Sequence, residues 1–485
     1  MNQRLRINGT GSERSTRKHD ESAVCRGACP NLFTPSQGRE NRTPQISRRS
    51  FVRTGIPMVV GGLSLAGFST VSGDQPVVYD FSGSDADSLQ RMLLLHSGEF
   101  CRVRLRPGAT IMCPVREDRI GGEKSPHALL IPEKVRLDLN GSTLLLDLRS
   151  NSYGIRLTNH AAISGGTVRV VHSEGKGSQG CWHSAISVGA AYGDGGTPEK
   201  PGYFTSVSHW AIEDMVIDQQ VEASAIQLMS EACHGVIRNI TISDSDVALL
   251  GIGMDWGSVG PITSEDRMIP QMQTLWHQKQ IYSTHPHDIL IQNIRIGRLG
   301  RNQDANDAGI RCSACHRITI QNVAVKSAAA AIAVWGGDCG YEFARAEQRA
   351  AAHSGYVIEN VSIDAAHRFG LVLNGSADNI LRAARDYGYQ PLLDPVHPGI
   401  FRPVIRNLRL LGTGQGPAQG VYAVSVSDAA CEHLDVRQFD IGIHVEDWVR
   451  GMRFEHCSIT DNTRNVLVEG ATEPATGVTF DLPVR

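Results

Sequence analysis

A short pattern recurs along this chain: an apolar residue, any residue, asparagine, and then alternating apolar residues. Its clearest copies stand at 237–242, 291–296, 320–325, 358–363 and 405–410. Alternation of this kind over short runs is typical of β-strands, and helical periodicity is scarce beyond residue 75. One pattern repeated many times indicates stacked units that share a core.

The spacing of the repeat indicates the kind of stack. Its central residues lie 25 residues apart from Asp214 to Asn239 and 29 apart from Asn293 to Asn322, whereas 54 residues separate Asn239 from Asn293. Asparagine tolerates left-handed geometry at a tight bend, and stacked side-chain amides can bond from coil to coil in a ladder. We therefore predict an all-β, single-stranded, right-handed parallel β-helix of about ten coils, rather than a β-sandwich or a propeller.

Two early segments carry a family resemblance. Leu-Asp-Leu-Asn-Gly-Ser at 137–142 and Ile-Ser-Gly-Gly-Thr-Val at 163–168 are similar to the opening coils of the pectin-lyase-like right-handed β-helix superfamily. The resemblance spans roughly residues 78–470 and implies this fold together with a carbohydrate substrate. The better-known enzyme signatures of that superfamily, Gly-His-Gly and Arg-x-Pro-x-x-Arg, are missing from the sequence. The resemblance therefore implies a substrate class but no bond chemistry.

The N-terminal part has the order of an export signal. Ser-Arg-Arg-Ser-Phe-Val-Arg at 47–53 matches the twin-arginine pattern, and a Gly-rich run follows that is too short and weakly apolar for a membrane span. We predict a disordered lead-in at 1–46, a twin-arginine signal peptide at 47–73 and a β-helix domain at 74–485. Helical spacing of apolar residues at 85–97 predicts a capping helix. The mature chain would be periplasmic or secreted.

Charge separates these regions. Through Gly73 there are 11 Lys and Arg and 4 Asp and Glu, out of 47 and 50 in the whole chain. The remainder carries 36 against 46, a net charge of −10. This balance argues against nucleic-acid binding, and against a polyanionic substrate unless basic residues gather locally. We expect a polysaccharide partner, no membrane association after signal cleavage, and a monomer.

Two coils agree beyond their core positions. Gly, Asp and Gly stand 14, 16 and 18 residues after Asn239, and again after Asn322. The aspartates are Asp255 and Asp338, and the coil between them carries Asp307 near the same station. Insertions at one station project from one edge of a solenoid and would wall a groove suited to an extended polymer. Such insertions follow at 258–286, 341–355 and 377–402.

These carboxylates could hydrolyse a glycosidic bond. Strands of adjacent coils lie about 4.8 Å apart, so Asp255 and Asp338 would be roughly 9–10 Å apart at the backbone, with Asp307 or Arg311 between them. Retaining glycosidases need two carboxyl groups about 5–5.5 Å apart, and inverting ones about 6.5–9.5 Å. We predict a glycoside hydrolase in which Asp255, Asp307 and Asp338 supply this pair and Arg311 steadies the substrate. The plainer interpretation is that Gly-x-Asp-x-Gly forms a tight polar turn.

Aromatic side chains gather near the same edge. Their faces can stack on sugar rings and bury area at little entropic cost, which makes them candidate substrate-binding residues. The alternative is that they cap the core or hold the insertions in place. These residues are Trp256, Trp276 and Trp335.

Other functions remain open. A polysaccharide lyase would use β-elimination, with a base such as Lys279 or His277 and Ca²⁺ as an aid. His-Pro-His-Asp at 285–288 resembles the Asp-Pro-His-Asp motif of mannuronan epimerases, which share the fold, with His in place of the first Asp. The resemblance carries over to the last three residues, and His287 joins the candidate substrate-binding residues. A non-catalytic glycan-binding or surface protein is the remaining alternative.

No cofactor and no metal are expected. Cys-Ser-Ala-Cys-His at 312–316 has the form of a haem c attachment site, but Cys233-His234 would occupy the place of its last two residues in an earlier coil. The pair then belongs to the repeat, and haem is not expected. His277, His285 and His287 have no diagnostic metal spacing. We expect most of the nine cysteines after Gly73 to be small buried side chains rather than a disulfide framework.

Overall fold

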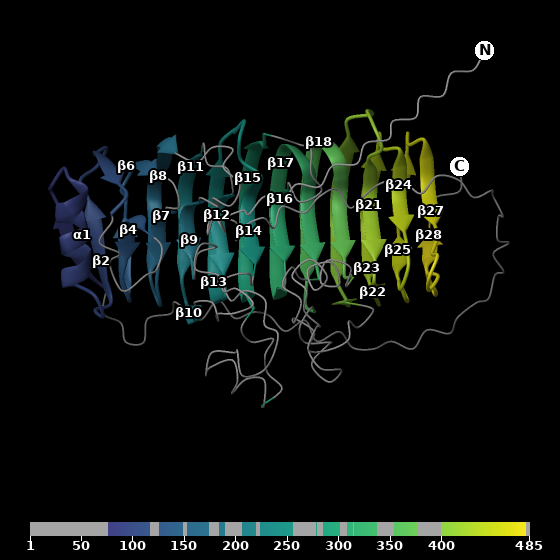
Figure 1. Cartoon of the computed structure of the whole chain (residues 1–485), viewed down its shortest axis with the longest axis horizontal. Coiled ribbons are helices and arrows are strands. Elements are labelled where there is room, and N and C mark those ends of the chain that lie inside the picture. The colour runs from purple at the N-terminus through teal and green to yellow at the C-terminus, as the bar shows by residue number, and fades with distance from the viewer. Residues whose placement is uncertain are drawn as a thin grey trace, which may run out of the picture.

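The computed structural model describes most of the chain beyond residue 75. The described residues are 76–116, 126–148, 153–173, 184–189, 206–219, 224–255, 278, 285–300, 308–313, 315–336, 354–376 and 399–481. Three columns of strands wind along one axis and form an elongated stack, in which all pairings between named strands are parallel (Figure 1). The predicted parallel β-helix is thereby confirmed. Among these residues, no helix is both long and apolar enough to cross a membrane.

The first column contains thirteen described strands. They are β1 (Val77–Phe81), β2 (Cys101–Leu105), β5 (Val135–Asp138), β8 (Ala162–Ser173), β11 (Ala211–Asp218), β13 (Glu231–Ile242), β15 (His287–Arg298), β17 (His316–Trp335), β18 (Val357–Asn374), β20 (Val404–Gly412), β23 (Ala430–Arg437), β25 (Arg453–Glu455) and β28 (Thr479–Asp481). Eight of them, from β8 to β23, continue through a bend into the second column. That column also contains β3 (Thr110–Pro114), β6 (Thr143–Leu148) and β26 (Ser458–Thr460).

The third column carries the candidate site. Its strands are β4 (His127–Ile131), β7 (Tyr153–Leu157), β9 (Ser184–Val188), β12 (Ser224–Met229), β14 (Leu250–Asp255), β16 (Ala308–Ser313), the ends of β17 and β18, β21 (Gln419–Val424), β24 (Ile441–Val445) and β27 (Arg464–Val468). These eleven described strands agree with the prediction of about ten coils. Smaller pieces flank the columns, namely β10 (Ser206–Ser208), β19 (Ile400–Phe401) and β22 (Val426–Ser427).

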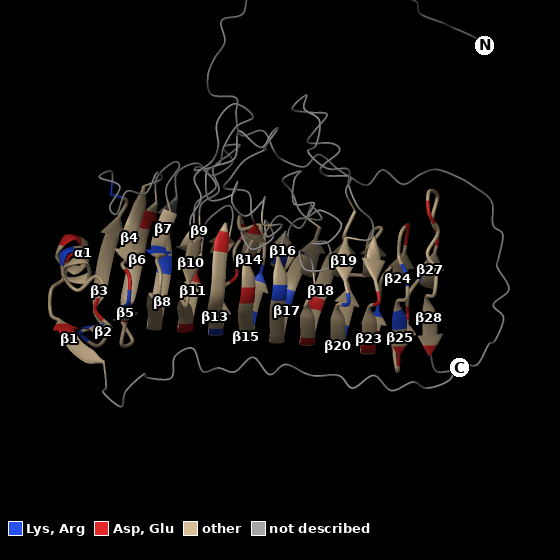
Figure 2. Cartoon of the chain, turned by 90° about the horizontal axis from the view of Figure 1, so that it is seen from below, with Lys and Arg blue, Asp and Glu red and all other residues tan. Residues whose placement is uncertain are grey.

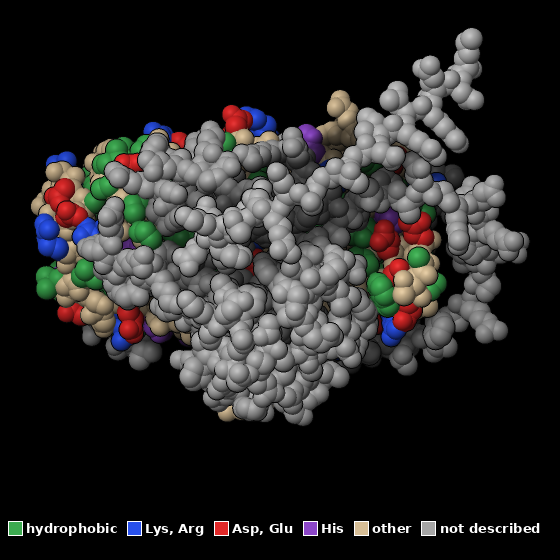
Figure 3. Space-filling view, in the orientation of Figure 1, with side chains coloured by type: hydrophobic (Ala, Val, Ile, Leu, Met, Phe, Trp, Pro, Cys, Tyr) green, Lys and Arg blue, Asp and Glu red, His purple; other side chains and the backbone are tan. Residues whose placement is uncertain are grey.

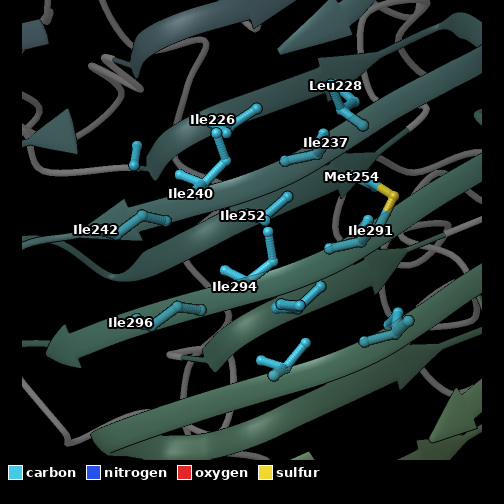
Figure 4. Close-up of a cluster of buried hydrophobic side chains, with 14 of the residues drawn as sticks. Ile226, Leu228, Ile237, Ile240, Ile242, Ile252, Met254, Ile291, Ile294 and Ile296 are labelled. Carbon is cyan, nitrogen blue, oxygen red and sulfur yellow. The ribbon is translucent and has the colours of Figure 1, made fainter. Parts of the chain in front are cut away.

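One apolar core fills the interior along the stack. The register aligns equivalent side chains of successive coils, as when Ile237 pairs with Ile291 and Ile291 with Ile320. All three are fully buried, and isoleucines of the second and third columns lie side by side inside the coil, as Ile252 and Ile294 do (Figure 4). Each coil alone would leave this face exposed, so the stack is held together by burial shared between neighbours.

The predicted helix closes the N-terminal end of the stack (Figure 1). It spans α1 (Ala86–Leu95), begins at the N-cap Asp85, whose side chain accepts a hydrogen bond from the Ser88 N–H, and buries Leu89 and Leu93 in the core. Gln90 donates to the Leu130 carbonyl at 3.0 Å and accepts from the Leu130 N–H at 2.8 Å. Among the described residues, β4 pairs with a strand on one side only. The two bonds from Gln90 provide partners for the Leu130 N–H and carbonyl groups on its open edge.

Two bends in each coil have left-handed backbone. The asparagine bend, between the first and second columns, contains Asp214, Asn239, Asn293, Asn322, Asn360 and Asn407, with φ between 54° and 57°. Each asparagine amide donates to the preceding member of this series at 2.7–3.1 Å, which confirms the predicted ladder. The mixed bend lies five residues before each of these positions and contains His209, His234, Asp288, Arg317, Gly355 and Arg402, with φ between 50° and 74°. Lys134, His160 and Asp428 are the left-handed residues at the same place in other coils.

Candidate functional site

The third column is buried on both faces. Every residue of β12, β14 and β16 is buried, although only alternate side chains can point into the core. Outward-facing apolar residues form a second cluster, which includes Leu250, Phe369 and Tyr422 and is separate from the interior core. An outer face with this degree of burial differs from the first and second columns, whose outer residues are partly exposed.

A polar row crosses the outer face of the third column. The register aligns Arg156, Ser187, Gln227, Gly253 and Arg311 on successive strands. The two arginines are only 1% and 5% exposed. Gln227 accepts from the Ser224 hydroxyl at 2.8 Å, so its carbonyl oxygen is held in place. The row therefore places two buried cations on one face, about 19 Å apart at the coil spacing of parallel strands.

Asp255 and Arg311 form a buried ion pair at the end of this row. Asp255 ends β14 and Arg311 lies in the adjacent β16, where the register pairs it with Gly253. The Arg311 Nη2 lies 3.4 Å from the Asp255 Oδ2, and both side chains are almost fully buried. The two strands lie side by side in the stack (Figure 2). Charges buried to this degree need each other or a polar ligand to offset lost hydration.

The other predicted site residues divide into two groups. Trp335 ends β17 level with Ser313, is 3% exposed and belongs to the outer apolar cluster. Its stacking on a sugar stays a prediction. Outside the described residues lie Asp307, Asp338, Trp256, Trp276, Lys279 and His277. The paired-carboxylate arrangement therefore has one described member, Asp255, which lies beside Arg311; the catalytic and substrate-binding roles of the two residues stay predictions.

A second group of polar residues surrounds His287 at the mixed bend. His287 Nε2 and His234 Nδ1 lie 3.7 and 3.8 Å from Asp288 Oδ2. The Arg317 guanidinium donates to both Asp288 oxygens at 2.6 Å. Burial alone would raise the pKa of Asp288, but the hydrogen bonds and charge of Arg317 outweigh it and hold that pKa below its ordinary value. Burial also lowers the pKa of His287 and raises that of the neighbouring Cys233 to about 12.

The register at this bend corrects one sequence prediction. Cys233 pairs with His287, and His287 pairs with His316. The predicted equivalence of Cys233-His234 with Cys315-His316 is therefore wrong by one residue. Cys312 and Cys315 lie in the interior core. The seven cysteines in the described part of the chain are free and buried, which confirms for them the expected packing role.

Sequence reasoning missed a third polar group near the C-terminal end. Tyr422 donates to Glu446 at 2.8 Å, and His444 Nε2 lies 2.9 Å from Glu469. Burial raises the pKa of Glu446, partly offset by the Tyr422 hydroxyl. Acidic side chains and a histidine are visible together at this end of the described surface (Figure 3). These residues come from three consecutive coils, so aligning the third-column strands would have revealed them.

Comparison with known proteins gives likeness in fold alone. No protein-family model matches the chain, and no curated protein matches its sequence. Among solved structures, the A-module of a mannuronan C-5 epimerase from Azotobacter vinelandii is 12% identical, with a TM-score of 0.44, over 83% of this chain and 94% of that one. A surface adhesin of Streptococcus pneumoniae is 10% identical, with a TM-score of 0.42, over 84% and 100%. An alginate lyase from a Paenibacillus species is 12% identical, with a TM-score of 0.25, over 72% and 98%.

Proposed function

We propose that this chain is an exported, monomeric, carbohydrate-active β-helix protein that acts on an acidic polysaccharide outside the cytoplasm. The proposal rests on the outer face of the third column, where Arg156 and Arg311 are buried in one row with Ser187 and Gln227 and Arg311 pairs with Asp255. The overall negative charge would disfavour a polyanionic ligand if the positive charges were scattered. In this chain two buried arginines, Arg156 and Arg311, lie in one row, so a local site for a polyanion is possible. The export route rests on the twin-arginine pattern at 47–53, outside the described residues.

The row suits an extended polymer of uronic acids. It runs along the stack axis, perpendicular to the strands, so a polysaccharide lying on it would meet one coil after another. A guanidinium can bind a sugar carboxylate in a fork of two hydrogen bonds. Asp255 would then hold the Arg311 guanidinium in position, while Ser187 and Gln227 offer hydrogen bonds to sugar hydroxyls.

The reaction that this charge pattern favours begins with proton abstraction at C5 of a uronate. Neutralising the sugar carboxylate with Arg311 makes that proton more acidic. In β-elimination a base removes the C5 proton, the electron pair forms the C4–C5 double bond, and the C4–O bond breaks as the leaving oxygen gains a proton. In epimerisation the proton returns to the opposite face of C5. Lys279 and His277 remain the predicted bases.

Hydrolysis is the second candidate, because Asp255 is a carboxylate on the same face. It requires a second carboxyl group within about 5–5.5 or 6.5–9.5 Å, for which Asp307 and Asp338 remain the predicted partners. A neutral polysaccharide would then be the expected substrate. Glycan binding without turnover is the third candidate, and the same experiment separates all three.

The test is an activity screen of the full chain on neutral and acidic polysaccharides, recording reducing ends and absorbance at 235 nm. We expect absorbance on a uronan, or altered uronate stereochemistry by NMR, and a fall of at least about 100-fold for Arg311→Met, the loss typical of a single charge-stabilising group. Asp255→Asn should lose less, because it only repositions Arg311. Arg169→Met is the matched control, since Arg169 pairs with Asp218 at 2.7 Å on an exposed surface.

Each alternative outcome has a definite meaning. Reducing ends without absorbance, abolished by Asp255→Asn, would establish hydrolysis instead. Binding of a uronan without turnover would establish the glycan-binding function. Activity that Arg311→Met and Arg169→Met change equally would refute the site.

A further inference from the structure

We propose that Cys233, His234, His287 and Asp288 form a structural zinc site that fastens two consecutive coils together. The site goes beyond the proposed function and shares no residue with the polar row. The Sγ of Cys233 and the ring nitrogens of His234 and His287 all lie within 4.8 Å of one another. The Asp288 Oδ2 lies 3.8 Å from His234 Nδ1 and 3.7 Å from His287 Nε2, and we assign it as the fourth donor.

The fold creates this donor set from two dipeptides. The register of β13 and β15 pairs Cys233 with His287. His234 and Asp288 follow them at the mixed bend, with φ of 50° and 53°. Left-handed backbone at both positions turns the second side chain of each dipeptide back beside the first. Cys-His on one coil thus faces His-Asp on the next.

The distances suit a tetrahedral ion. Zinc bonds of about 2.0–2.3 Å place tetrahedral ligand atoms roughly 3.3–3.7 Å apart. The two separations to Asp288 are already close to this value. The separations among Cys233, His234 and His287, which are at most 4.8 Å, need a contraction of up to about 1.5 Å. Asp288 must also turn toward Cys233, and side-chain rotations supply both movements. One thiolate, two imidazoles and one carboxylate favour zinc over calcium or magnesium, which take oxygen ligands.

Neighbouring groups orient the ligands. His287 Nδ1 lies 2.8 Å from the His285 carbonyl oxygen. A carbonyl can only accept, so Nδ1 carries the proton and Nε2 presents its lone pair to the donor set. Arg317 holds the Asp288 carboxylate by two hydrogen bonds. Partners of this kind are typical around metal ligands, where they fix the tautomer and the carboxylate direction.

Stacking of imidazoles explains only part of the arrangement. His160, His209 and His234 stack along the mixed bend with ring centroids 4.8 and 5.2 Å apart. This column accounts for His234 without a metal. His287 likewise stacks on His316 with ring centroids 4.8 Å apart. Stacking does not account for the Cys233 thiol within 4.8 Å of both imidazoles, nor for the Asp288 carboxylate beside them. The half-exposed side chain of His234 leaves an entry path for an ion, whereas Cys233 and His287 are buried.

The site would join the two ends of the longest chain segment that separates neighbouring first-column strands among the described coils. Chain segments 231–242 and 287–298 are adjacent in the first column, yet 54 residues separate their ladder asparagines. Bringing the ends of a long connecting segment together costs chain entropy, and a metal bound to residues at both ends offsets part of that cost. All four ligands come from protein, as in structural rather than catalytic zinc sites.

The experiment measures metal binding by the full chain after treatment with a chelator. We expect one zinc ion per chain by mass spectrometry of the dialysed protein, and a higher midpoint of thermal unfolding with zinc. His234→Asn should weaken binding by more than about tenfold, the lower end of what even an indirect partner of a metal ligand costs. His209→Asn is the matched control, since His209 has the same left-handed backbone, stacks on His234 and lies outside the donor set.

Cobalt gives an independent readout. Wild type and His209→Asn should show a thiolate-to-cobalt charge-transfer band, and Cys233→Ala should lack it while keeping the fold by circular dichroism. Absence of bound zinc in wild type would overturn the proposal. Equal weakening by His234→Asn and His209→Asn would overturn it as well. Neither result bears on Arg311 or Asp255, so failure here is distinct from failure of the proposed function.

Discussion

The two left-handed bends of each coil share one backbone shape and differ in what occupies it. At the asparagine bend five successive coils, from Asn239 to Asn407, have the same side chain, and each amide bonds to the previous one. Over the same five coils the mixed bend carries His234, Asp288, Arg317, Gly355 and Arg402, and its contacts are imidazole stacks and ion pairs. A uniform series can only repeat one structural contact, whereas a varied series can place different donors at chosen coils. A bend position that keeps one residue type along the stack therefore indicates a structural role. A bend position whose residue type varies indicates where a specific binding or catalytic site can form.

The largest expected effect comes from breaking the uniform bend. Asn322→Val places a β-branched side chain at a φ of 57° and removes the bonds to Asn293 and Asn360. We expect the free energy of unfolding to fall by about 2–3 kcal/mol, from backbone strain and two lost hydrogen bonds. Urea denaturation measures this value. Asn322→Gly keeps the backbone shape and should lose roughly half as much; an equal loss would show that strain contributes nothing.

An intermediate effect is expected from an ion pair at the mixed bend. A double-mutant cycle on Arg317→Ala and Asp288→Asn, run with a chelator present, should give a coupling of about 1 kcal/mol. The pair is bidentate and the Asp288 side chain is only 14% exposed. The exposed pair of Arg298 and Asp246 is the control, with an expected coupling below about 0.5 kcal/mol. Equal couplings would mean that the mixed bend gains nothing from its ion pair.

The smallest expected effect is that of removing the charge of Asp244, and its dependence on pH distinguishes a charged contact from the amide contacts of the asparagine bend. Asp244 accepts from the Arg298 N–H and from Lys326, which hold its pKa below the ordinary value of 3.8. Its stabilisation is therefore present above that value and is lost as pH falls through the lower, folded-state pKa. Because solvent screens this half-exposed group, Asp244→Asn should cost no more than about 0.5 kcal/mol at neutral pH.

This cost should diminish as the pH falls below 3.8 toward the lower, folded-state pKa. The loss from Asn322→Gly should not change with pH, because amides do not titrate in this range. Urea denaturation at neutral pH and at about pH 3, below the ordinary carboxyl pKa, measures both. A pH-independent loss for Asp244→Asn would mean that its geometry matters and its charge does not.

The fold was predictable because its determinants are local and repeated. Each copy of the Ile-x-Asn pattern encodes two short strands and the bend between them, and many copies average out the exceptions. The capping helix was predictable for a similar reason, since Leu89 and Leu93 lie on one helical face and are fully buried. Register was harder to predict. Cys233-His234 was matched to Cys315-His316 by residue type, whereas the left-handed residues His234 and Arg317 determine the alignment.

The candidate sites were predictable only in part. Coil spacing correctly predicted that Asp255 and Arg311 lie in adjacent coils, because insertions do not change which strands are neighbours. The donor set around His287 was missed because its residues are split between two coils and have no fixed spacing in sequence. A usable signal exists, since counting six residues back from Asn239, Asn293 and Asn322 aligns Cys233, His287 and His316.

The buried cysteines allow local separation of the coils to be measured by chemical labelling. Seven thiols, from Cys101 to Cys457, are distributed along the described length and are almost inaccessible to solvent. An alkylating reagent can reach each one only when its coil separates from a neighbour, so labelling rates would map local opening along the axis. If the chain is exported as proposed, the same inaccessibility would protect these thiols in an oxidising compartment, where exposed free cysteines pair or oxidise.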